Sequence, residues 1–126
     1  MQKIIDVIME DGTAKPMTFR QDGFVPIAMK RIFRRDFLSV LTEFKEIGEA
    51  AILENMDKVS ELAYAMFCRG ENVDLMTADS NSYIEWISSL DANAITMISG
   101  DIVALYMKGL EATSAAKKAA AQPSGA

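Results

Sequence analysis

The sequence predicts a mainly α fold with an N-terminal β-hairpin (α+β), with about four to five helices in one small domain. Three observations predict this class. Residues 3–20 hold two short runs typical of strands around an Asp-Gly pair, and apolar residues recur at helical spacing over residues 24–111. Half of the 126 residues are hydrophobic, so a core can form without disulfides or metal ions.

The first element is expected to be the hairpin. Ile5 and Val7 share one face of a β-branched run, because side chains alternate along a strand. Asp11-Gly12 is typical of a tight hairpin turn, since glycine accepts a positive φ. Pro16 has no N–H to donate, which favours an edge position for the second strand. An isolated hairpin is marginal in water, so we expect this one to pack on helices or to pair with another subunit.

Helical spacing begins after the hairpin. Pro26 suits the first turn of a helix, where its missing N–H has no partner to lose. Apolar residues at helical spacing cover 26–35, with Ile27 among them, and then 37–47. Asp36 is a candidate cap between the two segments, and the pattern leaves open whether they form one helix or two.

The clearest helical pattern covers residues 49–69, where apolar residues make a continuous stripe and Glu61 lies mainly off it. Gly70 is well placed to end the helix. A short helix is expected over 82–90. Asp91 or Asn93 can cap the last helix, which carries a further apolar face.

Composition changes after residue 111. We expect residues 1–111 to form a single globular domain, with the hairpin over 3–20 and the helical part over 24–111. Residues 112–126 are mostly Ala, Lys, Ser, Gln, Pro and Gly and have little to bury, which predicts a disordered Ala/Lys-rich tail. The apolar stretches are far shorter than the roughly 20 residues that span a bilayer, and Asp6 interrupts the first one too early for a secretory signal. The sequence thus favours a cytoplasmic protein without a membrane partner.

The net charge of −5 is unevenly distributed. Residues 1–35 carry seven Lys and Arg against four Asp and Glu, whereas residues 36–126 carry six against fourteen. The acidic majority argues against a nucleic-acid partner, because binding to phosphates needs a coherent basic surface. One basic cluster stands out: Lys30, Arg31, Arg34 and Arg35. Its ordinary interpretation is a solvated helix surface, and its functional interpretation is contact with an acidic partner helix.

Residues that carry chemistry are scarce. The chain has no histidine, and its one cysteine, Cys68, lies in an apolar helical pattern typical of a buried structural thiol. Glu85 beside Trp86 is explained by a surface carboxylate next to a core tryptophan. Neither a phosphate-binding glycine loop nor a nucleophile elbow or metal-ligand cluster is present. We therefore expect no catalytic residues, no cofactor, no metal and no enzyme activity.

Methionine is frequent, with nine residues in the chain. Met97 and Met107 lie near the apolar side of the last predicted helix. Flexible thioethers fill irregular cores, and they also suit surfaces that accept several related partner helices. Both interpretations stay open for these two residues.

Three segments, in this order, resemble the phage tail assembly chaperones of long-tailed phages and prophages of Gram-positive bacteria. The first is the hairpin with MTFR (17–20) and then IFRRDFL (32–38). The second is VSELAYAM (59–66), similar to the central helix of the family, and the third is SYIEWISSLD (82–91), with its aromatic-x-Glu-Trp-Ile pattern. Together they extend over most of residues 3–110. The entry into the first helix, with Pro26, departs from the family pattern and leaves the start of that helix open.

The resemblance implies a non-enzymatic tail assembly chaperone that binds the phage tape measure protein in the host cytoplasm and keeps it soluble. Such a protein is absent from the mature virion. A longer form made by ribosomal frameshifting would recruit the tail tube protein, and self-association is expected. The expected contact surfaces are the first basic helix and the last two helices. Their candidate partner-binding residues are Lys30, Arg31, Arg34, Arg35, Tyr83, Trp86, Met97 and Met107.

Two other functional classes stay open. One is a small acidic adaptor or regulatory binding protein, for which steeply salt-dependent binding to duplex DNA would be evidence. The other is a structural head–tail connector or tail component, which would be found in mature particles.

Overall fold

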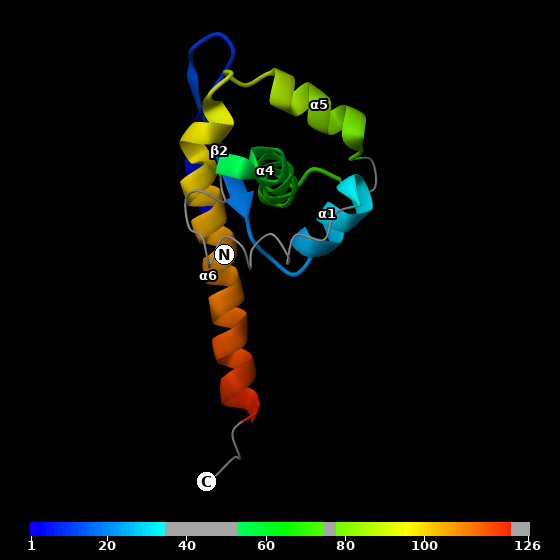
Figure 1. Cartoon of the computed structure of the whole chain (residues 1–126), viewed down its shortest axis with the longest axis vertical. Coiled ribbons are helices and arrows are strands. Elements are labelled where there is room, and N and C mark those ends of the chain that lie inside the picture. The colour runs from blue at the N-terminus through cyan, green and yellow to red at the C-terminus, as the bar shows by residue number, and fades with distance from the viewer. Residues whose placement is uncertain (35–52, 75–77, 122–126) are drawn as a thin grey trace.

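Two antiparallel strands open the chain, β1 (Gln2–Ile8) and β2 (Ala14–Arg20). The computed structural model describes residues 1–34, 53–74 and 78–121. Within these residues the hairpin is followed by four helices in one small compact domain, shown in Figure 1: α1 (Val25–Phe33), α4 (Met56–Gly70), α5 (Ser80–Ser88) and α6 (Ala94–Ala121). The predicted class, a mainly α fold with an N-terminal hairpin, is confirmed.

The hairpin has the turn and the edge that its sequence predicts. Gly12 has a φ of 87°, a value that glycine adopts without strain. Pro16 faces Asp6 in the ladder. In an antiparallel ladder, residue pairs joined by hydrogen bonds alternate with pairs that are not joined. Met9 N donates to Thr13 O, so Met9 and Thr13 form a hydrogen-bonded pair. Three pairs further along, Asp6 and Pro16 therefore form a pair without hydrogen bonds. The proline therefore removes no ladder bond from the sheet.

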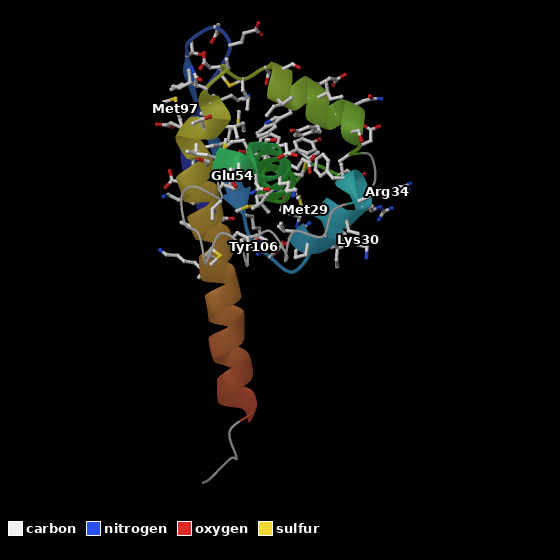
Figure 2. All side chains as sticks on the ribbon, viewed as in Figure 1. Met29, Lys30, Arg34, Glu54, Met97 and Tyr106 are labelled. Carbon is white, nitrogen blue, oxygen red and sulfur yellow. The ribbon has the colours of Figure 1, made fainter. Side chains whose placement is uncertain are left out.

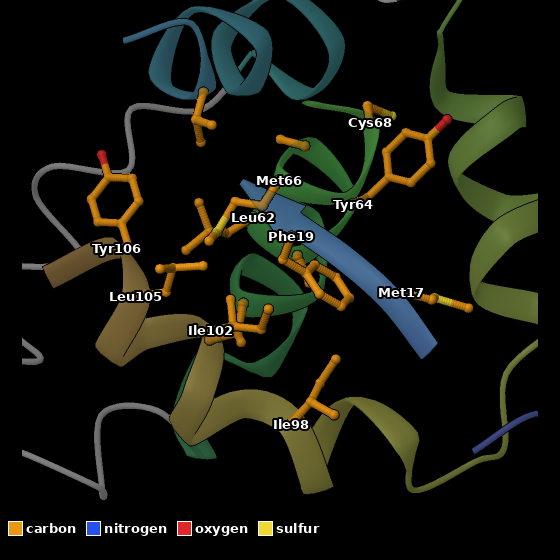
Figure 3. Packing of buried hydrophobic residues seen from close by; sticks show 14 of the residues in the cluster. Met17, Phe19, Leu62, Tyr64, Met66, Cys68, Ile98, Ile102, Leu105 and Tyr106 are labelled. Atoms are coloured by element: carbon orange, nitrogen blue, oxygen red, sulfur yellow. The ribbon is translucent and has the colours of Figure 1, made fainter. Parts of the chain in front are cut away.

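Helix α4 lies at the centre of the fold. Figure 1 shows it end-on, with β2, α1, α5 and α6 around it, and it contacts all four. Figure 3 shows the packing between β2, α4 and α6, where the largest fully buried side chains include Phe19, Leu62, Met66, Ile102 and Tyr106. Burial of these side chains stabilises the contact between the three elements.

The end of α4 fits closely against β2. The helix ends at Gly70, as its sequence predicts, and a Cβ atom at this position would overlap the carbonyl group of Thr18. The next residue, Glu71, accepts a hydrogen bond of 2.7 Å on its carboxylate from the Thr18 N–H. The backbone N–H that an edge strand leaves open is thus satisfied by a side chain.

Several helix details differ from the predictions. Residues 37–47, and the start predicted for the third helix at 49, lie outside the described residues. In α1, Ile27 was expected on the apolar side, but it is 54% exposed. In α4, Glu61 was expected on the polar side, but only 8% of it is exposed, because it lies where the end of α1 and α5 meet α4.

The last helix is longer than expected. The sequence predicts disorder over 112–126, yet α6 continues to Ala121, and residues 122–126 lie outside the described part. Alanine and lysine have high helix propensity, so a segment with nothing to bury can still extend a helix that is already formed. The last turns of α6 project beyond the other elements (Figure 1). None of the described helices has the length and apolar character needed to cross a membrane.

Candidate partner-binding surface

One side of α1 carries exposed cations. Ala28, Met29 and Ile32 face the core, which leaves positions 30, 31 and 34 on the outer side of the helix. Figure 2 shows Lys30 and Arg34 there, pointing away from α4. No described acidic side chain forms an ion pair with either of them or with Arg31. Within the described part of the chain, these charges are therefore not neutralised by an acidic side chain. Arg35, the fourth predicted cation, lies outside the described residues.

Several other cations in the described part form ion pairs within the fold. Arg69 Nη2 lies 2.8 Å from Asp22 Oδ2, and Lys3 Nζ lies 3.1 Å from Asp101 Oδ1. The Arg69 guanidinium also lies over the ring of Phe24, 5.3 Å from its centroid. These contacts tie elements of the fold together. The cations of α1 form no such tie to a described acidic residue, and they lie together on one side of a helix, which makes them candidates for an external contact.

A hollow of about 420 Å³ lies beside the cations, between the end of α1, α4 and α5. Its described lining residues are Ile32, Phe33, Arg34, Glu61, Ser80, Tyr83 and Ile84. Arg34 lies in the left-handed region, with φ 56° and ψ 36°, and its N–H donates to the Lys30 carbonyl at 2.8 Å. This conformation ends α1 at the hollow, so that one residue belongs both to the basic face and to the hollow.

The aromatic wall of the hollow is held in place by its neighbours. The Tyr83 hydroxyl forms a 2.7 Å hydrogen bond with Ser60 Oγ on α4. Its ring meets the ring of Phe33 edge-on at 4.9 Å between centroids and that of Tyr64 at 5.6 Å. Such edge-to-face contacts are favourable for aromatic pairs. A partner would therefore meet a wall that is already ordered and would lose little entropy on binding.

Helix α5 forms the outer side of the hollow and has a side-chain cap. Asp79 Oδ1 accepts hydrogen bonds from the Ser82 N–H at 2.8 Å and from the Ser82 hydroxyl at 3.0 Å. These bonds lower the pKa of Asp79 and fix the first turn of the helix. Ile84, one turn further, is 55% exposed although it is a large apolar residue. Apolar surface that is left open beside free cations is typical of a protein contact site.

The structure separates the remaining predicted contact residues. Trp86 is only 9% exposed and packs on Phe67 and Tyr64, with ring centroids at 5.2 and 5.5 Å, so it anchors α5 in the core. Met107 is half-buried against the same core. Met97 is 65% exposed, but it lies on α6, away from α1 (Figure 2). Of the described candidates, Arg34 and Tyr83 are brought together, and Lys30 and Arg31 adjoin them.

Ile84 is the surface residue that sequence reasoning missed. Tyr83, Trp86, Ile87 and Leu90 make the apolar stripe of this segment, and Ile84 lies outside that stripe. An apolar residue outside the stripe of a short helix was the signal that could have found it.

A second hollow of about 800 Å³ lies at the tip of the hairpin. It is lined by residues 9–11 and 13–16 and by Ser89, so it is mainly the inner curve of one turn. The Asp11 carboxylate there already accepts hydrogen bonds from the N–H and the hydroxyl of Thr13, at 2.9 and 2.6 Å. This hollow brings together few residues that are distant in sequence, and we regard the first hollow as the stronger candidate.

The described residues offer little for catalysis or metal binding. They contain no group of three His, Cys, Asp or Glu side chains that could hold a metal ion. Cys68 is fully buried, and burial raises the pKa of its thiol, which keeps it protonated and unreactive. Burial likewise raises the pKa of the neighbouring Tyr64. No family model, no curated protein and no solved structure matches this chain.

Proposed function

We propose that this protein is a non-enzymatic tail assembly chaperone, which binds a phage tape measure protein in the host cytoplasm and keeps it soluble until the tail tube forms. The specific identity rests on the resemblance of three sequence segments to that family. The observation that carries a binding role is the joint surface of α1 and α5, where cations that pair with no described acidic residue adjoin exposed apolar side chains and a hollow.

The physical demands of this task fit such a surface. A tape measure protein is long and helical, and its apolar stripes would aggregate if they stayed exposed. A helical groove with apolar and charged contacts covers such stripes without any chemical step. Several copies bound along one target would gain from multivalency, and self-association would assist them. Under this proposal the protein leaves before the virion is complete, and a longer frameshifted form recruits the tail tube protein.

Co-expression with the tape measure protein of the same phage or prophage tests this function. Only the tape measure protein carries a tag, and the amounts in the soluble and insoluble fractions are compared with and without this chain. We expect the tape measure protein to become soluble and to carry several copies of this chain through purification. A tape measure protein that stays insoluble, with this chain absent from the purified material, would show that the proposed function is wrong.

A small acidic adaptor or regulatory protein is the second candidate. The same surface of α1 and α5 favours it, because an acidic helix of another protein would find the same charges and the same hollow. The co-expression experiment separates the two candidates, since an adaptor would leave the solubility of the tape measure protein unchanged.

A further inference from the structure

We propose that the surface of α1 and α5 binds an amphipathic helix that inserts an apolar side chain into the hollow beside Arg34 and pairs acidic side chains with Lys30, Arg31 and Arg34. This inference rests on the proposed function and specifies the chemistry of the segment that is bound. It is argued from the placement of charge, of exposed apolar surface and of the hollow.

The cations have the spacing of one helical turn. Lys30 and Arg34 are four residues apart, and the hydrogen bond from Arg34 N to Lys30 O holds them on the same side of α1. Asp or Glu residues three or four positions apart on a partner helix have matching spacing, because they too lie one turn apart. Arg31 adds a third donor beside them, and an arginine can hold a carboxylate through two hydrogen bonds.

The apolar contact lies directly beside this charge. Arg34 lines the hollow together with Phe33, Tyr83 and Ile84. Ile84 is 55% exposed and Ile27, on α1, is 54% exposed. A partner helix that carries an apolar stripe with acidic residues along one border would cover the isoleucines and the hollow and reach the cations at the same time. A phosphate backbone would use the cations but would leave the isoleucines uncovered.

Charge variants test the electrostatic half of the proposal. The double variant Lys30→Glu, Arg31→Glu is compared with the control Lys15→Glu, Lys108→Glu, which changes the net charge equally at exposed positions of β2 and α6. Affinity for the tape measure protein is measured at low and at physiological salt concentration. We expect the α1 variant to bind at least about tenfold more weakly and its binding to lose its dependence on salt. Charges at the rim of an interface govern both the affinity and its salt dependence. The control should bind as the wild type does.

Ile84→Asp tests the apolar half, with Ile4→Asp as its control. Both positions are exposed, at 55% and 66%, so neither change disturbs the core, and only the first lies at the hollow. We expect Ile84→Asp to abolish measurable binding and Ile4→Asp to leave it unchanged. Circular dichroism and thermal unfolding verify that both variants are folded.

The outcomes separate the two proposals. If the wild type fails to bind the tape measure protein, the proposed function is wrong. If the wild type binds and the α1 and Ile84 variants bind equally well, the function stands and this surface is not the contact. Duplex DNA serves as a second probe with the wild-type chain. The assignment to a helical protein partner would be overturned if the chain bound DNA tightly, with a steep salt dependence, and if Ile84→Asp bound it equally well.

Discussion

The two sides of α4 are built differently. Toward β2 and α6, large apolar side chains are fully buried and the end of the helix lies against strand backbone (Figure 3). Toward α1 and α5, aromatic rings are partly exposed and a hollow stays open beside Arg34. At Gly70 the first side has no room for an added Cβ atom, and its buried side chains hold the fold together. The second side depends on a few polar contacts and leaves apolar and cationic groups available, so binding can be altered there without loss of the fold.

Gly70→Ala should produce the largest effect, since it tests the closely packed side. The added Cβ would overlap the Thr18 carbonyl, and backbone on both sides must move, which we expect to destabilise the protein by about 3 kcal/mol or more. Gly100→Ala is the matched control, because a Cβ atom at that exposed position of α6 meets nothing within 4 Å. It should stabilise the protein by about 0.5–1 kcal/mol. Chemical denaturation measures both, and equal effects would contradict this account of the packing.

Tyr83→Phe tests the open side and should have a moderate effect. It removes the hydrogen bond to Ser60 Oγ and keeps the ring in its aromatic contacts. We expect a loss of about 1 kcal/mol in the free energy of unfolding. Ser60→Ala and the double variant complete a thermodynamic cycle. A coupling energy near zero would mean that this bond does not hold α5 on α4.

Acid should weaken the contact between α4 and the segment before α1. Partial burial of Asp22 opposes its ionisation, but hydrogen bonds from Arg69 Nε and the Phe24 N–H outweigh this and lower its pKa below the ordinary value of 3.8. A carboxylate whose pKa is lowered by folding stabilises the folded state at pH values above its ordinary pKa. This stabilisation is lost as the pH falls through the pKa of the folded state. The difference in unfolding free energy between wild type and Asp22→Asn should be below about 1 kcal/mol at pH 7 and should shrink below pH 4. A difference that is constant with pH would contradict the role of Asp22.

Arg34→Gly should have the smallest effect on stability, and in the favourable direction. The residue has a φ of 56°, where glycine avoids the steric cost that other residues bear. We expect a gain of a few tenths of a kcal/mol, up to about 1 kcal/mol, together with weaker binding of the tape measure protein. Thermal unfolding and an affinity measurement on the same sample show both. A variant that is less stable and binds normally would assign Arg34 a structural role instead.

Much of the fold was predictable from local patterns. The turn at Gly12, the edge position of Pro16 and the helix end at Gly70 follow from backbone chemistry that a few neighbouring residues determine. The exposure of Ile27 and the burial of Glu61 were not predictable, because helical spacing gives one apolar side and does not say how many elements cover a helix. The extension of α6 was missed because disorder was inferred from composition, whereas a helix can continue on propensity alone.

The candidate surface was predictable only in parts. The sequence singled out Arg34 and Tyr83 separately, for charge and for aromatic character. Their common place at one hollow depends on how α1 and α5 pack on α4, and these residues are far apart in the chain. Trp86 was expected to be a core tryptophan from its neighbours and a partner contact from the resemblance, and its packing on Phe67 agrees with the core position.

Amide hydrogen exchange on this chain, alone and bound to the tape measure protein, tests the central claim most directly. The claim is that the side of α1 and α5 binds while the side of β2 and α6 holds the fold. We predict slower exchange in the complex at residues 25–34 and 80–88, with little change at Met97 and in β1. Protection confined to β1 and the face of α6 that carries Met97 would contradict it, and would move the binding surface to the opposite side of the molecule.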